Sequence, residues 1–330
     1  MNCSGPPPHG VATTSPSVLG MTTPQLSIML RTYAAEDPGT WQPVFDTARA
    51  ADAAGIDRVL LSDHVVFGEH LDAYGRPESG GVEGGKQPTG PDGHWLEPLT
   101  TLSVLCGMTS RVRLCTNILI AALRRPVVLA KATATLDVLS GGRLDLGVGI
   151  GWQREEYEAA GLDFGSRGRQ LDLTLEVCQT LWREPRAKVD LAGVAFEAIH
   201  MMPKPRQPGG VPIWVSGRLN ERVARRLARF GSGWIPWGED ADDLTTSIPR
   251  MREAVGAAGG DADAIQVAGT LPTVRREDRS LDLDATMERV RPLVEAGVTD
   301  FRAYVPVPSV YDAAVDYLRG VADGFHSATR

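Results

Sequence analysis

The chain has 330 residues, of which 42% are hydrophobic. Folding at this size removes roughly three quarters of the unfolded surface from water, so the chain can bury a large core. Its formal net charge is −7, with acidic and basic residues interspersed, which argues against nucleic acid or an anionic membrane surface as the main partner. Its apolar runs are shorter than a transmembrane helix requires.

The four cysteines show no metal-ligand spacing, and the last three lie in apolar segments. This distribution is typical of reduced core thiols and indicates a cytoplasmic protein. The cysteines are Cys3, Cys106, Cys115 and Cys178.

Residues 1–23 are rich in Pro, Gly, Ser and Thr and contain no basic start followed by an apolar run. We therefore expect a disordered tail rather than a signal peptide. Translation could start at Met1 or at Met21. We expect residues 24–330 to form a single domain, because no linker-like segment divides them.

In the first half of the chain, apolar residues at every second position predict strands, and one-sided apolar spacing predicts helices. Residues 65–95 are rich in Gly and Pro, and a segment of this length and composition is typical of a lid, a binding loop or a disordered loop. The other expected elements are a strand at 25–30, a helix at 41–54, a strand at 57–62, a helix at 96–108, a strand at 112–120, a helix at 126–139 and a strand at 144–150.

The second half continues the alternation. Its expected elements are a polar turn of helix at 153–158, a helix at 166–182, a hairpin or irregular excursion at 183–211, strands at 212–215, 233–236, 265–270 and 299–304, and helices at 220–230, 242–258, 283–296 and 309–324. Eight strands, each followed by a helix, favour a closed (β/α)8 TIM barrel over an open doubly wound sheet. The two irregular stretches are then long insertions, one after strand 2 and one before strand 5.

The fourth strand contains Gly147, Gly149 and Gly151 between its apolar residues. A dinucleotide-binding loop needs a small residue where Trp152 stands, so the pattern departs from the Rossmann fingerprint. A glycine-rich strand in a crowded sheet, without a ligand, is a second interpretation. We favour a third, in which bare backbone at the end of the strand forms the floor of a ligand site.

The active site of a barrel of this kind lies at the C-terminal ends of its strands. Residues at these ends are therefore the candidate site residues. They are Asp63, His64, Thr116, Asn117, Gly149, Gly151, Trp152, Ser216, Gly217, Arg218 and Trp237.

His64 is the candidate catalytic residue, because an imidazole titrates near neutral pH and can donate or accept a proton. A histidine that only orders the loop is the alternative. We expect Asp63 to orient His64 or a backbone turn rather than to act as a base.

Ser216, Gly217 and Arg218 come directly before a helix that Asn220 is expected to cap. Free N–H groups and the positive end of the helix dipole suit a phosphate there, and the guanidinium of Arg218 adds a bidentate donor. A plain capped turn with a solvated arginine is the alternative interpretation.

Several tryptophans could wall a pocket for a flat ring, although core packing explains some of them equally well. The sequence contains no metal-ligand cluster, no Gly-x-Ser-x-Gly elbow and no lysine on a strand. A barrel without these groups takes its chemistry from an organic cofactor. The tryptophans are Trp95, Trp152, Trp214, Trp234 and Trp237.

Three stretches together resemble the bacterial luciferase-like flavin-dependent family. They are Asp63-His64, the segment from Leu123 to Asp172 and the block from Pro212 to Trp237. The likeness runs from about residue 25 to residue 305, and within the family it is closest to the actinobacterial branch that uses the deazaflavin coenzyme F420.

This resemblance implies a flavin or deazaflavin ring across the C-terminal mouth of the barrel. Asp63 and His64 would lie beside the ring. The Thr116-Asn117-Ile118 stretch would support one face and would contain a non-proline cis peptide. The remaining cofactor contacts that the resemblance implies are Gly149, Gly151 and Trp152 at the border of the cofactor and Ser216, Gly217 and Arg218 at its phosphate.

The implied activity is hydride transfer between coenzyme F420 and an organic substrate. The sequence departs from the sugar-phosphate dehydrogenase branch, which has a glutamate where Trp152 stands, so that substrate is not carried over. A monooxygenase that uses reduced FMN and oxygen is the alternative function, and a non-catalytic flavin-binding protein is a third. We expect a small-molecule substrate, no metal, and possible homodimers, which are common in proteins that resemble this one.

Overall fold

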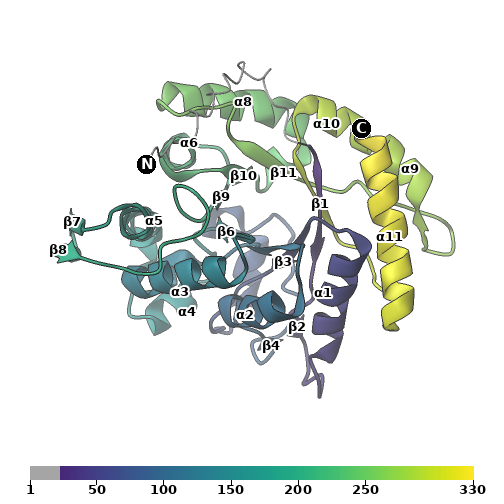
Figure 1. Cartoon of the computed structure of the whole chain (residues 1–330), viewed down its shortest axis with the longest axis horizontal. Coiled ribbons are helices and arrows are strands. Elements are labelled where there is room, and N and C mark those ends of the chain that lie inside the picture. The colour runs from purple at the N-terminus through teal and green to yellow at the C-terminus, as the bar shows by residue number, and fades with distance from the viewer. Residues whose placement is uncertain (1–22) are drawn as a thin grey trace, which may run out of the picture.

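Eight short parallel strands close into a barrel at the centre of the computed structural model, which describes residues 23–330 (Figure 1). Around the barrel the order is β1, β14, β11, β10, β9, β6, β5 and β3, and β1 pairs with both β3 and β14. The predicted (β/α)8 barrel is confirmed. The strands are β1 Gln25–Met29, β3 Arg58–Leu61, β5 Arg113–Thr116, β6 Leu144–Val148, β9 Ile213–Ser216, β10 Gly233–Ile235, β11 Gln266–Thr270 and β14 Asp300–Ala303.

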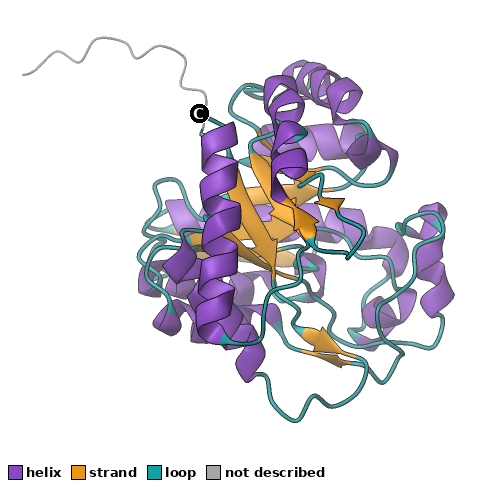
Figure 2. Ribbon diagram, turned by 90° about the vertical axis from the view of Figure 1, so that its right-hand side faces the viewer, coloured by secondary structure: helices purple, strands orange, loops and turns teal. Residues whose placement is uncertain are grey.

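Helices surround the strands on the outside of the barrel (Figure 2). This arrangement follows from the parallel pairing, because consecutive parallel strands need a crossover connection. The first and last of the helices, α1 and α11, pack side by side next to β1 (Figure 1). The helices are α1 Gln42–Ala54, α2 Pro98–Met108, α3 Pro126–Leu139, α4 Arg154–Ala159, α5 Arg167–Arg183, α6 Glu221–Phe230, α7 Glu239–Asp242, α8 Leu244–Ala257, α9 Leu283–Glu288, α10 Val290–Ala296 and α11 Tyr311–Ala328.

Three small antiparallel sheets lie outside the barrel. The insertion after β3 contributes β4 (His94–Trp95), which pairs with β2 (Tyr33–Ala34). The excursion before β9 contains the hairpin of β7 (Ala187–Leu191) and β8 (Val194–Ile199), which projects from the body of the protein at the left of Figure 1. A third pair, β12 (Val274–Arg275) and β13 (Leu281–Asp282), was not expected from the sequence.

The strand expected over residues 112–120 is shorter than predicted, because β5 ends at Thr116. The next peptide bond, between Asn117 and Ile118, is cis. It lies within the stretch for which the family resemblance implies a non-proline cis peptide. Leu119 then donates its backbone N–H to the carbonyl of Gly147 at 2.8 Å.

Two expected helices are interrupted. The helix expected at 283–296 divides into α9 and α10 at Arg289, where Pro292 cannot donate to the carbonyl of Glu288. The helix expected at 242–258 is preceded by α7, and Asp243 caps the start of α8 by accepting from the amide of Thr246.

Gly147 in β6 is required by the close approach of β5. A Cβ at this position would lie 2.0 Å from the carbonyl oxygen of Thr116, a distance that no side chain can occupy. Thr116 also donates its hydroxyl to the carbonyl of Gly147 at 2.7 Å. Part of the glycine pattern therefore serves the packing of the barrel and not a ligand.

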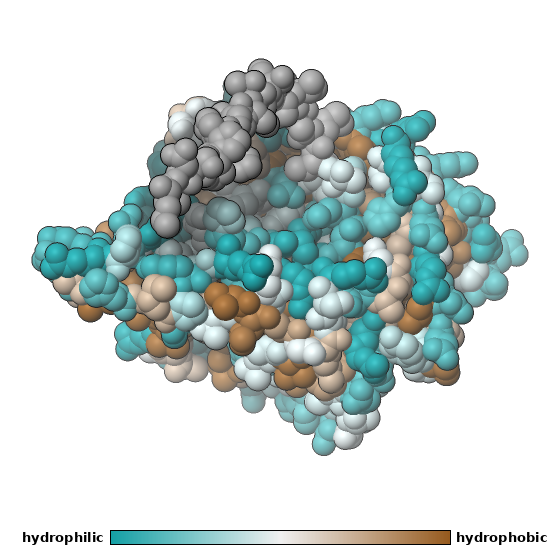
Figure 3. All heavy atoms as spheres, viewed as in Figure 1, coloured by the Kyte–Doolittle hydropathy of each residue, from teal (hydrophilic) through white to brown (hydrophobic). Residues whose placement is uncertain are grey.

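The tail expected over residues 1–23 lies outside the described residues, apart from Thr23. On the face shown in Figure 3, hydrophobic residues form small groups within a mainly hydrophilic surface. Among the helices of residues 23–330, none is long and apolar enough to cross a membrane. Of the expected core thiols, Cys115 and Cys178 are buried and Cys106 is partly buried, and all three are free.

Candidate active site

A cavity of about 440 Å³ opens at the C-terminal ends of the barrel strands, which is the end where (β/α)8 barrels have their active sites. Its volume lies within the usual range of small-molecule sites. The strand ends and the insertion after β3 form its walls. The residues expected from the sequence that line it are Asp63, His64, Asn117, Ile118, Gly149, Gly151, Trp152, Ser216, Gly217 and Trp237.

Two of the expected site residues, Thr116 and Arg218, do not line the cavity. Thr116 is fully buried, and its hydroxyl is bonded to the carbonyl of Gly147. Arg218 lies at the rim instead. A Cβ on Gly238 would be 2.7 Å from the Nε atom of Arg218. Gly238 directly follows Trp237, so the Arg218 guanidinium lies next to one edge of the cavity.

His64 is held by polar partners on both ring nitrogens. Its Nδ1 lies 3.2 Å from Oε2 of Glu156, and its Nε2 lies 3.1 Å from the amide nitrogen of Gln87. With the Gln87 amide donating to Nε2, the imidazole proton is on Nδ1 and is donated to Glu156. The arrangement is a histidine–carboxylate pair beside the cavity, in which the carboxylate fixes the tautomer of the imidazole.

Glu156 was not identified from the sequence as a site residue, because residues 153–158 were interpreted only as a polar turn of helix. The structure buries its side chain completely. Its second oxygen accepts from the backbone N–H of Val65 at 2.8 Å, so one carboxylate holds both His64 and the start of the loop. An acidic residue in the first turn of a helix that follows a barrel strand was the available signal.

Gln153, one residue before α4, is also buried and holds the same loop. With its amide oriented to satisfy both partners, it donates to the carbonyl of Val66 at 3.2 Å and accepts from the N–H of Gly68 at 3.1 Å. The start of α4 therefore fixes the backbone that follows β3, and with it the position of His64.

Asp63 lines the cavity, but other protein groups satisfy its carboxylate. Arg124 contacts both carboxylate oxygens, and the backbone N–H of Ile120 donates to Oδ2 at 2.8 Å. Burial raises the pKa of Asp63, while Arg124 and the Ile120 amide oppose that rise. Asp63 thus joins the ends of β3 and β5, in agreement with the expected role of orienting a backbone turn.

Aromatic side chains form much of the cavity wall. The ring of His64 lies 4.9 Å from that of Trp95 and 5.7 Å from that of Trp152, edge to face in both cases. Trp237 also lines the cavity, whereas Trp214 and Trp234 are buried away from it. Three of the five tryptophans considered from the sequence therefore face the site.

The indole N–H of Trp152 is buried and has no hydrogen-bond partner within residues 23–330. Trp152 lines the cavity and is only 6% exposed. An unsatisfied buried donor costs about 1–3 kcal/mol. The Trp152 indole is therefore a donor suited to an acceptor atom of a bound molecule.

The insertion after β3 covers one side of the cavity with residues that include Tyr74, Gly80 and Gln87. Trp237, after β10, donates its indole N–H to the carbonyls of Gly80 and Gly81 at 3.2 and 3.3 Å. The loop is thus held at its start by α4 and at its middle by Trp237.

Gly149 and Gly151 expose bare backbone to the cavity. A Cβ on Gly149 would lie 2.7 Å from Cδ1 of Ile118, and one on Gly151 would lie 3.2 Å from Cδ1 of Ile120. Gly151 also has a φ of +66°, which side chains disfavour. These glycines leave room for the side chains of Ile118 and Ile120 beside the Asn117–Ile118 peptide, and the ligand floor stays a prediction.

The phosphate site expected before α6 differs from the prediction. The side chain of Asn220 accepts from the amides of Arg222 and Val223, so these N–H groups at the start of the helix are already bonded. The amide of Gly217 donates to the carbonyl of Ile235 at 3.1 Å. Among the side chains of this turn, the hydroxyl of Ser216 and the guanidinium of Arg218 are available to an anion, and Arg218 forms no ion pair within residues 23–330.

These features fit a planar ring with a phosphate-bearing tail. The glycine backbone and the aromatic walls suit a flat ring, the Trp152 indole supplies an unused donor, and Arg218 supplies an unpaired cation at the rim. Within residues 23–330, no group of three His, Cys, Asp or Glu residues could hold a metal ion. The fold and the lining of the cavity fit a barrel enzyme that uses an organic cofactor.

The chain belongs to the luciferase-like monooxygenase family, whose family model matches residues 18–305. The family predicted from the sequence is therefore confirmed, and this is a family of oxidoreductases. Among the curated relatives, an uncharacterized protein of Mycobacterium tuberculosis is 32% identical over 219 residues, which are 66% of this chain and 73% of that protein. An F420-dependent glucose-6-phosphate dehydrogenase of Kineococcus radiotolerans is 31% identical over 220 residues, which are 65% of this chain and 58% of that protein.

Solved structures share the fold. An F420-dependent secondary alcohol dehydrogenase, in complex with an F420-acetone adduct, superimposes with a TM-score of 0.70 at 16% identity, over 92% of this chain and 99% of that one. A type II Baeyer–Villiger monooxygenase of Pseudomonas putida, in complex with FMN, gives a TM-score of 0.68 at 14% identity, over 92% and 98%. The same barrel therefore occurs in F420-dependent and in FMN-binding enzymes.

Proposed function

We propose that the protein is an oxidoreductase that moves a hydride between coenzyme F420 and a small organic substrate. The observation that supports this most directly is the His64–Glu156 pair beside a cavity walled by aromatic rings and bare glycine backbone. The 31% identity to an F420-dependent dehydrogenase favours the deazaflavin over FMN. When bound, the deazaflavin supplies the hydride donor or acceptor.

In this proposal the protein binds the ring and manages one proton. The glycine backbone at 149 and 151 and the side chain of Ile118 border the ring, and Arg218 and Ser216 hold the phosphate of the tail. His64 holds the proton that is exchanged with the substrate oxygen, and Glu156 compensates the charge of the imidazolium when His64 is protonated. The loop at 65–95 covers the cavity and limits the access of water.

The first test is anaerobic titration of the protein with oxidised and reduced F420 and, separately, with FMN. We expect saturable binding of F420 with a dissociation constant at least tenfold lower than that of FMN. Tighter binding of FMN, together with oxygen consumption on reduction, would support the alternative function of an FMN-dependent monooxygenase. That alternative is favoured by the structural similarity to the FMN-binding monooxygenase.

A matched pair of arginine variants tests the phosphate contact. Arg218→Ala removes the cation at the rim, whereas Arg222→Ala removes an exposed arginine of α6. Because a hydrogen bond to a charged group contributes about 1.5–3 kcal/mol, Arg218→Ala should weaken F420 binding by at least about tenfold, and Arg222→Ala should not. Equal effects of the two substitutions would contradict this placement of the phosphate.

If the cofactor binds but a broad panel of alcohols, aldehydes, ketones and enones shows no turnover, the third interpretation is favoured. The protein would then be a flavin-binding protein without catalytic activity.

A further inference from the structure

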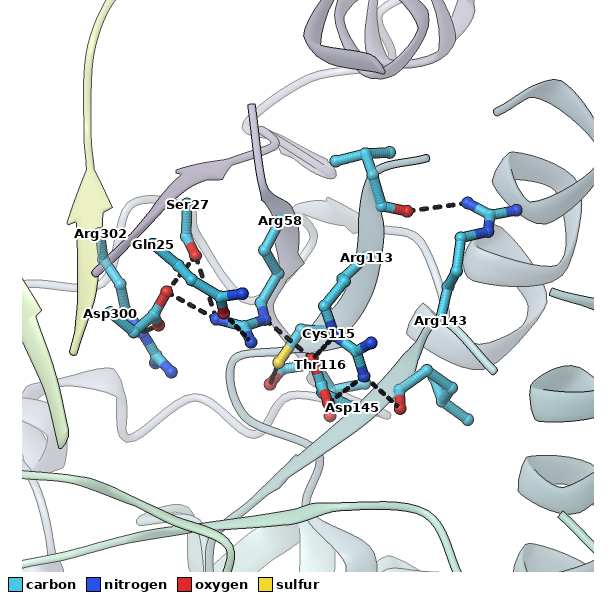
Figure 4. Close-up of polar contacts among 12 residues, drawn as sticks. Gln25, Ser27, Arg58, Arg113, Cys115, Thr116, Arg143, Asp145, Asp300 and Arg302 are labelled. Carbon is cyan, nitrogen blue, oxygen red and sulfur yellow. Dashed lines mark hydrogen bonds and ion pairs between the residues drawn. The ribbon is translucent and has the colours of Figure 1, made fainter. Parts of the chain in front are cut away.

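Figure 4 shows a chain of arginines and aspartates on the barrel strands. Arg58, Arg113 and Asp300 are the first residues of β3, β5 and β14, at the strand ends opposite those that form the cavity. At the centre of this chain, Arg58 of β3 donates from Nε to Oδ2 of Asp145 at 2.9 Å and from Nη1 to Oδ1 of Asp300 at 2.6 Å. Arg113 makes two further bonds to Asp145, at 2.7 and 2.6 Å. Arg302 donates from Nε to Oδ2 of Asp300 at 2.9 Å.

This cluster has a net positive charge, because three arginines are paired with two aspartates. The side chains of Arg58, Arg302 and both aspartates are at most 5% exposed, and that of Arg113 is 26% exposed. Burial would raise the pKa of Asp145, but Arg58 and Arg113 lower it below its ordinary value. Arg58 and Arg113 therefore hold Asp145 in its ionised form, and the cluster contains one more arginine than aspartate.

Arg302 extends the cluster toward the cavity. Its guanidinium and that of Arg58 both lie against the ring of Trp214, at 5.6 and 5.0 Å from the ring centroid. Trp214 belongs to a small buried cluster against which Ile118 packs, and Ile118 lines the cavity. From Nη1, Arg302 donates to the side-chain oxygen of Asn117, while its buried Nη2 has no partner within residues 23–330.

The contact with Arg302 determines how the amide of Asn117 is oriented. Because a guanidinium can only donate, the amide must direct its oxygen toward Arg302 and its NH₂ group away from it. Within residues 23–330, no protein group accepts from this NH₂ group, and Asn117 lines the cavity. A hydrogen-bond donor of fixed orientation is therefore present at the cavity floor.

We propose that Arg302 is a positioning residue that holds Asn117 as a hydrogen-bond donor to the cofactor ring, and that this pair makes the site bind the reduced ring more tightly than the oxidised ring. The inference rests on the proposed function, since it takes the ring to lie in this cavity. A reduced flavin or deazaflavin ring has two more electrons than the oxidised ring and can ionise to an anion. A donor of fixed orientation therefore interacts more strongly with the reduced form, because a hydrogen bond to an anion is the stronger one.

The test compares the dissociation constants of oxidised and reduced F420, measured by anaerobic titration, in the native protein and in Arg302→Met and Asn117→Leu variants. Each substitution should raise the constant of the reduced form relative to that of the oxidised form by at least about tenfold. For a two-electron couple this corresponds to a midpoint potential that is about 30 mV lower. Asn117 lies outside the ion-pair cluster, so Asn117→Leu tests the inference even if Arg302→Met does not fold.

Two control variants separate positioning from general electrostatics. Arg302→Lys keeps the charge and a donor, and should restore part of the native ratio. Arg113→Met removes a charge from the same cluster without touching Asn117, and should leave the ratio within about threefold of the native value. An equal change of the ratio in Arg113→Met and in Arg302→Met would overturn the positioning role. The same conclusion would follow if Arg302→Met and Asn117→Leu each weakened the binding of oxidised and reduced F420 equally.

The same titrations distinguish this inference from the proposed function. Binding of F420 with an unaffected ratio would overturn the inference and leave the proposed function standing. Failure to bind F420, combined with FMN binding that shows the expected ratio, would overturn the proposed function and support the inference. Failure to bind either cofactor would overturn both.

Discussion

His64 is held beside the cavity by residues that are distant from it in sequence. Its two ring nitrogens contact Glu156, 92 residues further on, and Gln87, 23 residues further on. Neither partner is part of a recognisable motif with His64. At the floor of the cavity, Arg302 likewise contacts a residue distant in sequence, Asn117, which is separated from it by 185 positions. At the scale of single residues, the chemistry of this site therefore depends on pairs that the barrel brings together.

A set of three substitutions tests the His64–Glu156 pair. Since general acid–base catalysis contributes about 10²–10⁴-fold, His64→Asn should lower kcat by about 100-fold, and Glu156→Gln should lower it by a smaller factor. Glu158→Gln, an exposed position of the same helix, should leave kcat unchanged. In all three variants the dissociation constant of the cofactor, measured by titration, should remain within about threefold of the native value. The kcat values are measured by steady-state kinetics on a substrate found by screening.

A structural role of His64 would give a different result. In that case His64→Asn would lower the melting temperature and the occupancy of the cofactor, with kcat per bound cofactor unchanged.

At the scale of elements, the loop at 65–95 is held by two anchors. The start of α4 binds its first residues through Gln153 and Glu156, and Trp237 binds the carbonyls of Gly80 and Gly81. The sequence indicated a lid, a binding loop or a disordered loop. Its observed course depends on buried polar groups, because the loop itself contributes few buried apolar residues.

Trp237→Phe tests the second anchor, since it removes the indole donor and keeps an aromatic ring. Loss of this hydrogen bond, which contributes about 1 kcal/mol, should weaken cofactor or substrate binding by about fivefold. Amide hydrogen exchange of residues 74–88 should become faster, while the melting temperature changes by less than about 3 °C. Trp41→Phe, at a tryptophan outside this loop, should change neither cofactor or substrate binding nor amide exchange. Similar changes in both variants would contradict the anchoring role of Trp237.

At the scale of the whole molecule, the ion-pair cluster joins strands around the closed barrel. Arg58 of β3 is bonded to Asp145 of β6 and to Asp300 of β14, which pairs with β1. The cluster therefore connects the first and last parts of the chain. Asp145 must be ionised to keep its ion pairs with Arg58 and Arg113.

Asp145→Asn tests this contribution to stability. Breaking a buried ion pair costs about 3–5 kcal/mol, so the melting temperature at pH 7 should fall by roughly 10 °C. Asp46→Asn, which disrupts the exposed pair with Arg49, should change the free energy of unfolding by less than about 0.5 kcal/mol.

The pH dependence follows from the lowered pKa of Asp145. A carboxyl whose pKa is lower in the folded state stabilises the fold fully above its ordinary pKa of 3.8, and this stabilisation is lost as the pH falls through the lower folded-state value. Thermal melts from pH 7 down to pH 3 should therefore show the difference between Asp145→Asn and the native protein narrowing below about pH 4. A difference that stays constant over this range would contradict the assignment.

The sequence by itself determined the alternation of strands and helices, the closed barrel and most of the residues at its C-terminal mouth. These follow from apolar spacing and from glycine and proline positions, which depend on neighbours a few residues apart. Local chemistry could not show that Thr116 bonds across to Gly147, or that Asn220 would occupy the helix amides expected to bind a phosphate.

The tertiary structure alone decided which charged and polar groups are paired. Asp63 with Arg124, His64 with Glu156 and Arg302 with Asn117 each join two β/α units. Because a charge can be buried only beside its partner, and the partner comes from another strand or helix, these contacts arise when the barrel closes. The position of the proton, the fixed donor at the floor and the ion-pair cluster are therefore properties of the closed barrel.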